Sequence, residues 1–140
     1  MTVLHATIER LKHNYCAYFK DDLDDEIGTV FGIGDTIYEV KKSLLESIEI
    51  VVEECQNNPE YILPEKLKGD FDVVFSMDMK SFLEYYSGIL SKSGLQKVTG
   101  INQKQLGHYQ SGLAKPRLKQ RERMQEGLHR LGEELMSIQF

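Results

Sequence analysis

Residues 95–112 read LQKVTGINQKQLGHYQSG, and this stretch decides how the C-terminal half of the chain folds. Its apolar residues recur at helical spacing on both sides of Gly100, which predicts two short helices, at about 92–99 and 102–111. Glycine readily adopts a positive φ, so Gly100 can form the turn after the first helix and Gly112 can end the second. Asn102 is a good N-cap for the second helix. We expect the pair to bury Leu95, Thr99, Ile101, Leu106 and Tyr109.

The flanking sequence predicts two further helices and no strand after Asp78. Asp78 can cap a helix whose apolar face comprises Met79, Phe82, Leu83, Tyr86, Ile89 and Leu90. Pro116 precedes a last helix whose apolar face comprises Leu118, Met124, Leu128, Leu131, Leu135 and Ile138. Residues 79–140 are therefore predicted to form an all-α domain.

The N-terminal half has the pattern of a small sheet with one helix. Residues 2–11 and 15–20 read as a β-hairpin, and residues 29–33 and 71–77 as two further strands. Thr36 and Glu39 have the spacing of a capping box. The helix that follows carries Ile37, Val40, Leu44, Ile48, Val51 and Cys55 on one face. The fold class is thus α+β, with a β-β-β-α-β domain over residues 1–78 and a helical domain over residues 79–140.

Charge divides the chain in the same place. The 140 residues carry a net charge of −5, but residues 1–79 hold 7 Lys/Arg against 17 Asp/Glu, whereas residues 80–140 hold 10 against 5. This asymmetry predicts two surfaces with different partners, the basic one suited to nucleic acid, although both could be merely solvated faces. No apolar run reaches the ~20 residues of a membrane span. With no signal-peptide pattern and only Cys16 and Cys55 as cysteines, we expect a cytoplasmic protein.

The stretch at residues 95–112 resembles the helix-turn-helix of the lambda-repressor-like (Xre/Cro) family. Ser111-Gly112 and the following Lys115-Pro116 also match that family's pattern. The chain departs from it at Gln96, where the family usually has a small residue, and at Gly107, which costs the helix about 1 kcal/mol relative to alanine. A helical hairpin used only for dimerisation is the alternative.

The resemblance implies that the second helix enters the major groove of operator DNA. Gln103, Lys104 and His108 would then read bases, since Gln suits adenine and Lys can reach guanine or a phosphate. Residues that hold register or contact phosphate would be Lys92, Asn102, Gln105, Lys115 and Arg117. Because one such module makes few base contacts, we expect a homodimer on two half-sites. The last helix and an edge of the N-terminal sheet are the candidate interfaces.

The N-terminal half is similar to the HicB antitoxin family. The matching features are the aromatic strand around Tyr15 and Tyr18, an acidic turn, and Gly34-Asp35-Thr36 with Glu39 opening the helix. Members of that family have a partial RNase H-like domain and often a C-terminal helix-turn-helix. The resemblance implies a type II antitoxin that neutralises a small basic ribonuclease toxin of the HicA kind and represses its own operon. The first residues expected to contact that toxin are Asp21, Asp22, Asp24, Asp25 and Glu26, although these could also form a solvated turn.

The alternative function is a helix-turn-helix regulator with an N-terminal ligand- or protein-sensing domain and no toxin. Enzyme functions find little support, and we expect no catalytic residue, metal or cofactor. Glu9 is the only carboxylate expected on a suitable strand face, whereas a metal nuclease needs several that converge. The acidic turn lacks the glycine and glutamate spacing of a calcium loop. Cys16 and Cys55 fit the protein core better than a nucleophilic site.

Overall fold

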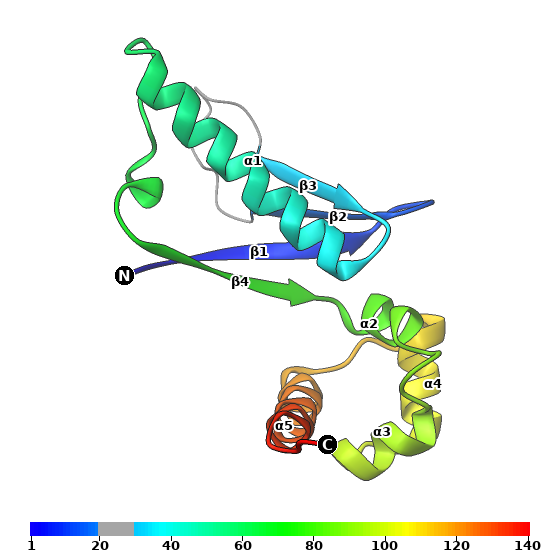
Figure 1. The fold of residues 1–140 in the computed structure, drawn as a ribbon. Helices are drawn as coiled ribbons and strands as arrows, with labels where there is room; N and C mark the ends of the chain where they lie inside the picture. Colours follow the sequence, from blue (N-terminus) through cyan, green and yellow to red (C-terminus); the bar gives the residue numbers. More distant parts are fainter. Residues whose placement is uncertain (20–29) are drawn as a thin grey trace. The chain divides into compact units, whose positions relative to one another are not determined.

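The computed structural model describes residues 1–19 and 30–140, which divide into two compact units, Met1–Met77 and Asp78–Phe140. Within these residues the fold is mixed α+β, with a four-stranded sheet and five α-helices, which confirms the predicted class (Figure 1). None of the described helices combines the length and the apolar character needed to cross a bilayer. The elements are β1 (Thr2–Arg10), β2 (Tyr15–Phe19), β3 (Phe31–Gly34), α1 (Ile37–Asn57), the 3-10 helix η1 (Glu65–Leu67), β4 (Phe71–Met77), α2 (Met79–Tyr85), α3 (Lys92–Thr99), α4 (Gln103–Ser111) and α5 (Leu118–Met136).

The sheet of the N-terminal unit has the strand order β3-β2-β1-β4. β1 pairs antiparallel with β2, β2 antiparallel with β3, and β1 parallel with β4. The turn between β1 and β2 is closed by a hydrogen bond from Leu11 N to Asn14 O at 2.8 Å. β3 and β4 run parallel at opposite edges of the sheet, and α1 and η1 form the long connection that this requires.

The helix α1 lies over one face of the sheet (Figure 1). Thr36 Oγ1 caps it by accepting the amide of Glu39 at 3.1 Å, while the Glu39 carboxylate accepts the amide of Asp35 at 2.9 Å. In the predicted capping box, Glu39 would accept the amide of the N-cap residue Thr36. It accepts instead the amide of Asp35, one residue earlier. Between helix and sheet lies a core that includes Leu4, Ala6, Ile8, Ala17, Val40, Leu44 and Ile48.

Backbone packs directly against backbone where α1 crosses β3. A Cβ on Gly32 would lie 2.5 Å from Leu44 N and 2.6 Å from Val40 O, closer than real Cβ contacts. Gly32 and Gly34 thus let the helix approach the strand, which explains the two glycines in this short strand.

The other face of the sheet carries the side chains that alternate with the core. His5, Thr7 and Glu9 of β1 point there, as expected from the alternation. Asp72 of β4 is a second carboxylate on this face, so Glu9 is not the only one, contrary to expectation. Asp72 pairs with Val3, six residues from Glu9 along β1, so the two carboxylates do not converge.

The C-terminal unit consists of α2, α3, α4 and α5 around a second core. Its buried residues are Met79, Leu83, Leu95, Ile101, Leu106, Tyr109 and Met124. Asp78 Oδ2 caps α2 by accepting the amide of Ser81 at 2.9 Å, which assigns Asp78 to this unit. Some expectations about the helix faces are wrong. α2 ends at Tyr85, so Ile89 lies beyond it and is 78% exposed, and Leu118 is 62% exposed at the start of α5.

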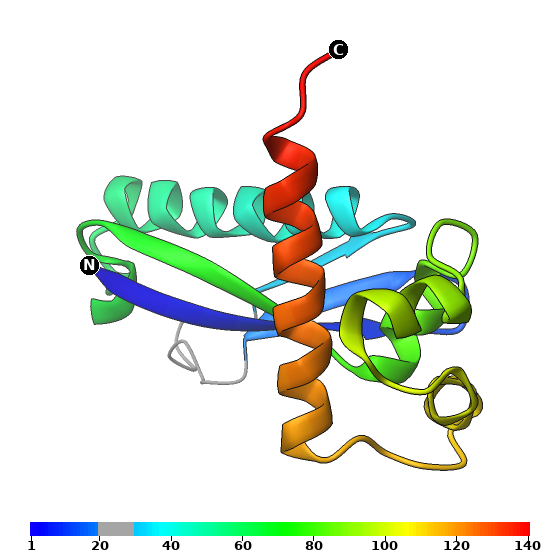
Figure 2. The ribbon, with the colours of Figure 1, turned by 90° about the horizontal axis from the view of Figure 1, so that it is seen from below.

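The helix α5 packs against α3 and then continues beyond the other three helices (Figure 2). Gly127 lies at the contact, where a Cβ would be 2.7 Å from Val98 O. Arg123 and Arg130 donate to the carbonyl oxygens of Gly100 (3.2 Å) and Val98 (3.5 Å), which lack partners within α3. Leu135 and Ile138 of the predicted apolar face are exposed.

Candidate nucleic-acid interface

The turn between α3 and α4 is held by buried hydrogen bonds. Gly100 has φ +76° and donates its amide to Gln96 O at 2.8 Å, which ends α3. The buried Thr99 hydroxyl donates to Leu95 O at 2.7 Å and accepts the amide of Ile101 at 3.1 Å. The hydroxyl therefore both donates and accepts a hydrogen bond, and it ties the last turn of α3 to the residue after Gly100.

Two carboxamides cap the N-terminus of α4. Asn102 Oδ1 accepts the amide of Lys104 at 2.8 Å, as its position before the helix predicted. Gln96 Oε1 accepts the amide of Gln103 at 2.9 Å across the turn. Gln96 is exposed, so it does not obstruct the packing of the two helices. The residue that departs from the family pattern thus joins the end of α3 to the beginning of α4.

One side of α4 presents polar side chains around a glycine. Gln103, Lys104, Gly107, His108 and Ser111 share this side, because residues three and four apart are neighbours on a helix. Gln103 and Lys104 are exposed, and His108 is half-buried. The opposite side buries Leu106 and Tyr109. The three residues predicted to read bases therefore lie on one face, with their side chains directed away from the core.

Gly107 lies at the centre of this face, and a lysine of the preceding helix lies beside it. A Cβ on Gly107 would lie 4.0 Å from the ε-carbon of Lys92, so the Lys92 side chain passes alongside the glycine. Lys92 is exposed at the first position of α3, and its side chain reaches α4 at Gly107. The structure thus places one predicted phosphate contact beside the predicted base readers.

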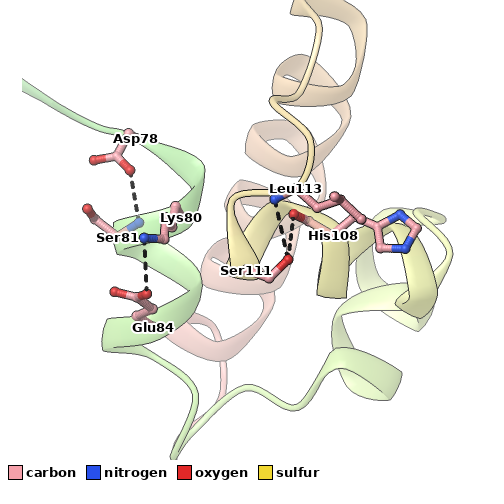
Figure 3. A network of polar contacts seen from close by, with 7 residues as sticks. All are labelled: Asp78, Lys80, Ser81, Glu84, His108, Ser111 and Leu113. Carbon is pink, nitrogen blue, oxygen red and sulfur yellow. Dashed lines mark hydrogen bonds and ion pairs between the residues drawn. The ribbon is translucent and has the colours of Figure 1, made fainter.

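The end of α4 is a compact turn that the His108 carbonyl organises (Figure 3). His108 O accepts the Ser111 hydroxyl and the amide of Ala114, both at 3.2 Å, and Ser111 Oγ accepts the amide of Leu113 at 3.4 Å. Figure 3 shows the His108 ring extending away from these bonds. The backbone of His108 is therefore fixed while its imidazole remains available for contact.

Sequence reasoning missed a further lysine beside this turn. A Cβ on Gly112 would lie 3.7 Å from the ε-carbon of Lys80 of α2, and Lys80 Nζ lies 3.8 Å from Glu84 Oε1 (Figure 3). Lys80 belongs to no sequence motif that we identified, so only the packing of α2 against α4 reveals its place beside this turn.

The remaining predicted phosphate and register residues lie around the same two helices. Lys115 and Arg117 are exposed in the connection between α4 and α5, and Arg117 is the N-cap of α5 without a side-chain cap bond. Asn102 is exposed, but its carboxamide oxygen is used in capping. Gln105 is half-buried on the flank of α4.

The predicted toxin-contact residues lie outside the residues that the structure describes. These are Asp21, Asp22, Asp24, Asp25 and Glu26. In the described part of the chain, residues 1–19 and 30–140, no group of three or more His, Cys, Asp or Glu side chains is arranged to hold a metal ion.

Two titrating groups have shifted pKa values. Burial, and secondarily the Glu9 carboxylate, raises the pKa of the Cys16 thiol, which keeps this thiol protonated at neutral pH. Burial, and secondarily Tyr85, raises the pKa of Tyr86, whose ring centre lies 4.8 Å from that of Phe82. Tyr86 thus belongs to an aromatic cluster at the end of α2 and is neutral there.

Comparison of the chain with models of protein families, with curated proteins and with solved structures gives no match.

Proposed function

We propose that the chain is a DNA-binding transcriptional autorepressor whose α3–turn–α4 pair is a helix-turn-helix, and that it is also a type II antitoxin. The observation that carries the DNA-binding part is the face of α4, with Gln103, Lys104 and His108 directed outward and Lys92 alongside at Gly107. A helix that buries one side and presents such groups on the other suits the major groove.

The electrostatics of the C-terminal half support the same function. Residues 80–140 carry 10 Lys/Arg against 5 Asp/Glu, and Lys92, Lys115 and Arg117 are exposed. Phosphate contacts supply most of the non-specific affinity for DNA and fix the register in which base contacts are made. We expect a homodimer, since two modules on half-sites about 34–36 Å apart would give the contact area of a specific complex.

The antitoxin part is supported by the acidity of the N-terminal half and by its similarity to the HicB pattern. A net charge of −10 over residues 1–79 would attract a small basic ribonuclease and speed its association. The alternative function, a regulator without a toxin, includes the same DNA binding and differs only in lacking the ribonuclease partner.

Binding to DNA is tested with the full chain and a labelled duplex taken from the region before its own gene. Fluorescence anisotropy should show tight binding that weakens steeply with salt, together with weaker binding to an unrelated duplex of the same length. Equal affinity for both duplexes at all salt concentrations would contradict the repressor function.

The toxin partner is tested by co-expression with the neighbouring open reading frame. If that frame encodes a short basic protein, we expect it to arrest growth alone, and to co-purify with this chain and lose its ribonuclease activity when both are present. A neighbour that neither binds the chain nor arrests growth would favour the regulator without a toxin.

A further inference from the structure

The two edges of the N-terminal sheet differ in whether another element bonds to their backbone groups. At the β3 edge, side chains of α1 occupy the backbone groups: Ser43 Oγ accepts the amide of Ile33 at 3.0 Å, and Ser47 Oγ donates to Phe31 O at 2.8 Å. Free backbone groups at an edge invite pairing with another chain, and proteins commonly cover them. The β3 edge is thus protected by its own helix.

Within the N-terminal unit, the described residues provide no such cover for the β4 edge. Thr2 N donates to Asp70 O at 3.3 Å, and Thr2 is in register with Phe71. In a parallel ladder this directs the backbone groups of even-numbered β4 residues toward β1 and those of odd-numbered residues toward the free edge. The residues whose backbone N–H and C=O groups point to the free edge are Phe71, Val73, Phe75 and Met77. One of these groups is hydrogen-bonded within the strand, since Val73 N donates to Asp72 Oδ1 at 3.0 Å.

We propose that β4 pairs antiparallel with β4 of a second copy of this chain, so that two four-stranded sheets join into one of eight strands. With the two-fold axis at Val74, Val73 lies opposite Phe75 of the second copy, and Phe71 lies opposite Met77. Odd-numbered residues therefore meet odd-numbered residues, and the outward N–H and C=O groups face each other as an antiparallel ladder requires. This register also pairs all seven residues of β4.

The side chains of β4 fit this arrangement. Asp72 is the only charged residue of the strand FDVVFSM, and in this register it lies opposite Ser76 rather than another carboxylate. A two-fold axis at Asp72 would instead place like charges opposite each other, which is destabilising. Phe71, Val73, Phe75 and Met77 lie half-buried on the α1 face, so their pairing would extend the apolar core across the axis.

A lysine of α1 lies near the strand without occupying its edge. Lys41 Nζ is 5.1 Å from the ring centre of Phe75, so it covers the α1 face of that side chain. The backbone groups in the plane of the sheet are not used by this contact. In the register with the axis at Val74, β4 is complementary to itself. Binding to a strand of a different protein would not require this property, so the pattern favours a second copy of this chain.

The test places charges on the proposed axis. Val74 is 45% exposed on the face opposite α1, so Val74→Lys should fold, yet in the dimer two lysines would face each other in a close, non-hydrogen-bonded pair. The matched control is Val3→Lys, at a site 49% exposed on the same face of β1 but away from the edge. Circular dichroism checks that both variants fold.

Sedimentation equilibrium of the full chain at micromolar concentration gives the outcome. We expect Val74→Lys and Val74→Glu each to have half the mass of the wild type and of Val3→Lys, and an equimolar mixture of the two Val74 variants to regain the full mass. A monomeric wild type, a Val74→Lys variant of unchanged mass, or a mixture that does not recover would each overturn the proposal. The measurement needs no DNA, so the proposed interface can fail while DNA binding stands, and the reverse.

Discussion

Replacing Gly127 by alanine should weaken the contact between α3 and α5, and Gly132 of the same helix offers a matched control. A Cβ on Gly127 would lie 2.7 Å from Val98 O and 3.0 Å from the Thr99 Cα. Both are backbone atoms at the end of α3, so neither can rotate away. At Gly132 a Cβ would meet no atom within 4 Å. The two substitutions are chemically identical and differ only in what the methyl group meets.

The expected magnitudes follow from two opposing effects. Alanine favours a helix interior over glycine by up to about 1 kcal/mol, so Gly132→Ala should raise the free energy of unfolding by that amount. Overpacking a fixed contact costs roughly 1–3 kcal/mol, so Gly127→Ala should be neutral to destabilising by about 2 kcal/mol. The difference between the two variants, about 1–3 kcal/mol, isolates the steric cost at α3.

Native-state amide hydrogen exchange measures this difference in the full chain, because it reports the stability of each unit separately. The buried amides of Leu95 and Leu106 should exchange faster in Gly127→Ala than in Gly132→Ala, while amides of the N-terminal unit should be unchanged. If Gly127→Ala stabilises the C-terminal unit as much as Gly132→Ala does, the close crossing of α3 and α5 is refuted.

Three further predictions concern single sites. Gly32→Ala should destabilise the N-terminal unit by about 1–3 kcal/mol or more in urea unfolding, because the methyl would meet the α1 backbone at 2.5 Å; an unchanged unfolding midpoint would contradict this close approach. The alkylation rate of Cys16 by iodoacetamide should still be rising with pH above 9, because its pKa is raised and only the thiolate reacts; a plateau below pH 9 would contradict this. Gln96→Ala should lower the thermal stability of the C-terminal unit by removing the acceptor for the Gln103 amide, whereas Gln96→Glu, which keeps an acceptor, should not; equal losses would show that the bond contributes little.

Local signals in the sequence predicted most elements of the fold. Asp78, Asn102 and Thr36 act as caps because capping depends on a few neighbouring residues, and Gly100 and Gly112 have the positive φ that their positions suggested. The alternation in β1 and the helical spacing in α1 separate core from surface correctly because each face is buried or exposed as a whole. Signals of this kind need no knowledge of distant contacts.

Contacts between distant residues could not be predicted. The approach of Lys80 to Gly112, the Gln96 cap on α4 and the lack of space at Gly127 all depend on how helices pack. The end of α2 was misplaced because the apolar spacing continues to Ile89 although the helix ends at Tyr85. Periodicity alone does not mark a helix end when no strong capping signal follows it.

The claim that α4 reads DNA is tested most directly by titrating single-base-pair variants of the bound duplex at several salt concentrations. Gln103→Ala and His108→Ala should each lose about 1–3 kcal/mol of discrimination at one base pair while retaining the salt dependence. Lys115→Ala should instead weaken binding to all sequences evenly and reduce the slope of log affinity against log salt by about 1. If all three variants lose affinity evenly and none changes its preference at any base pair, α4 does not read the bases.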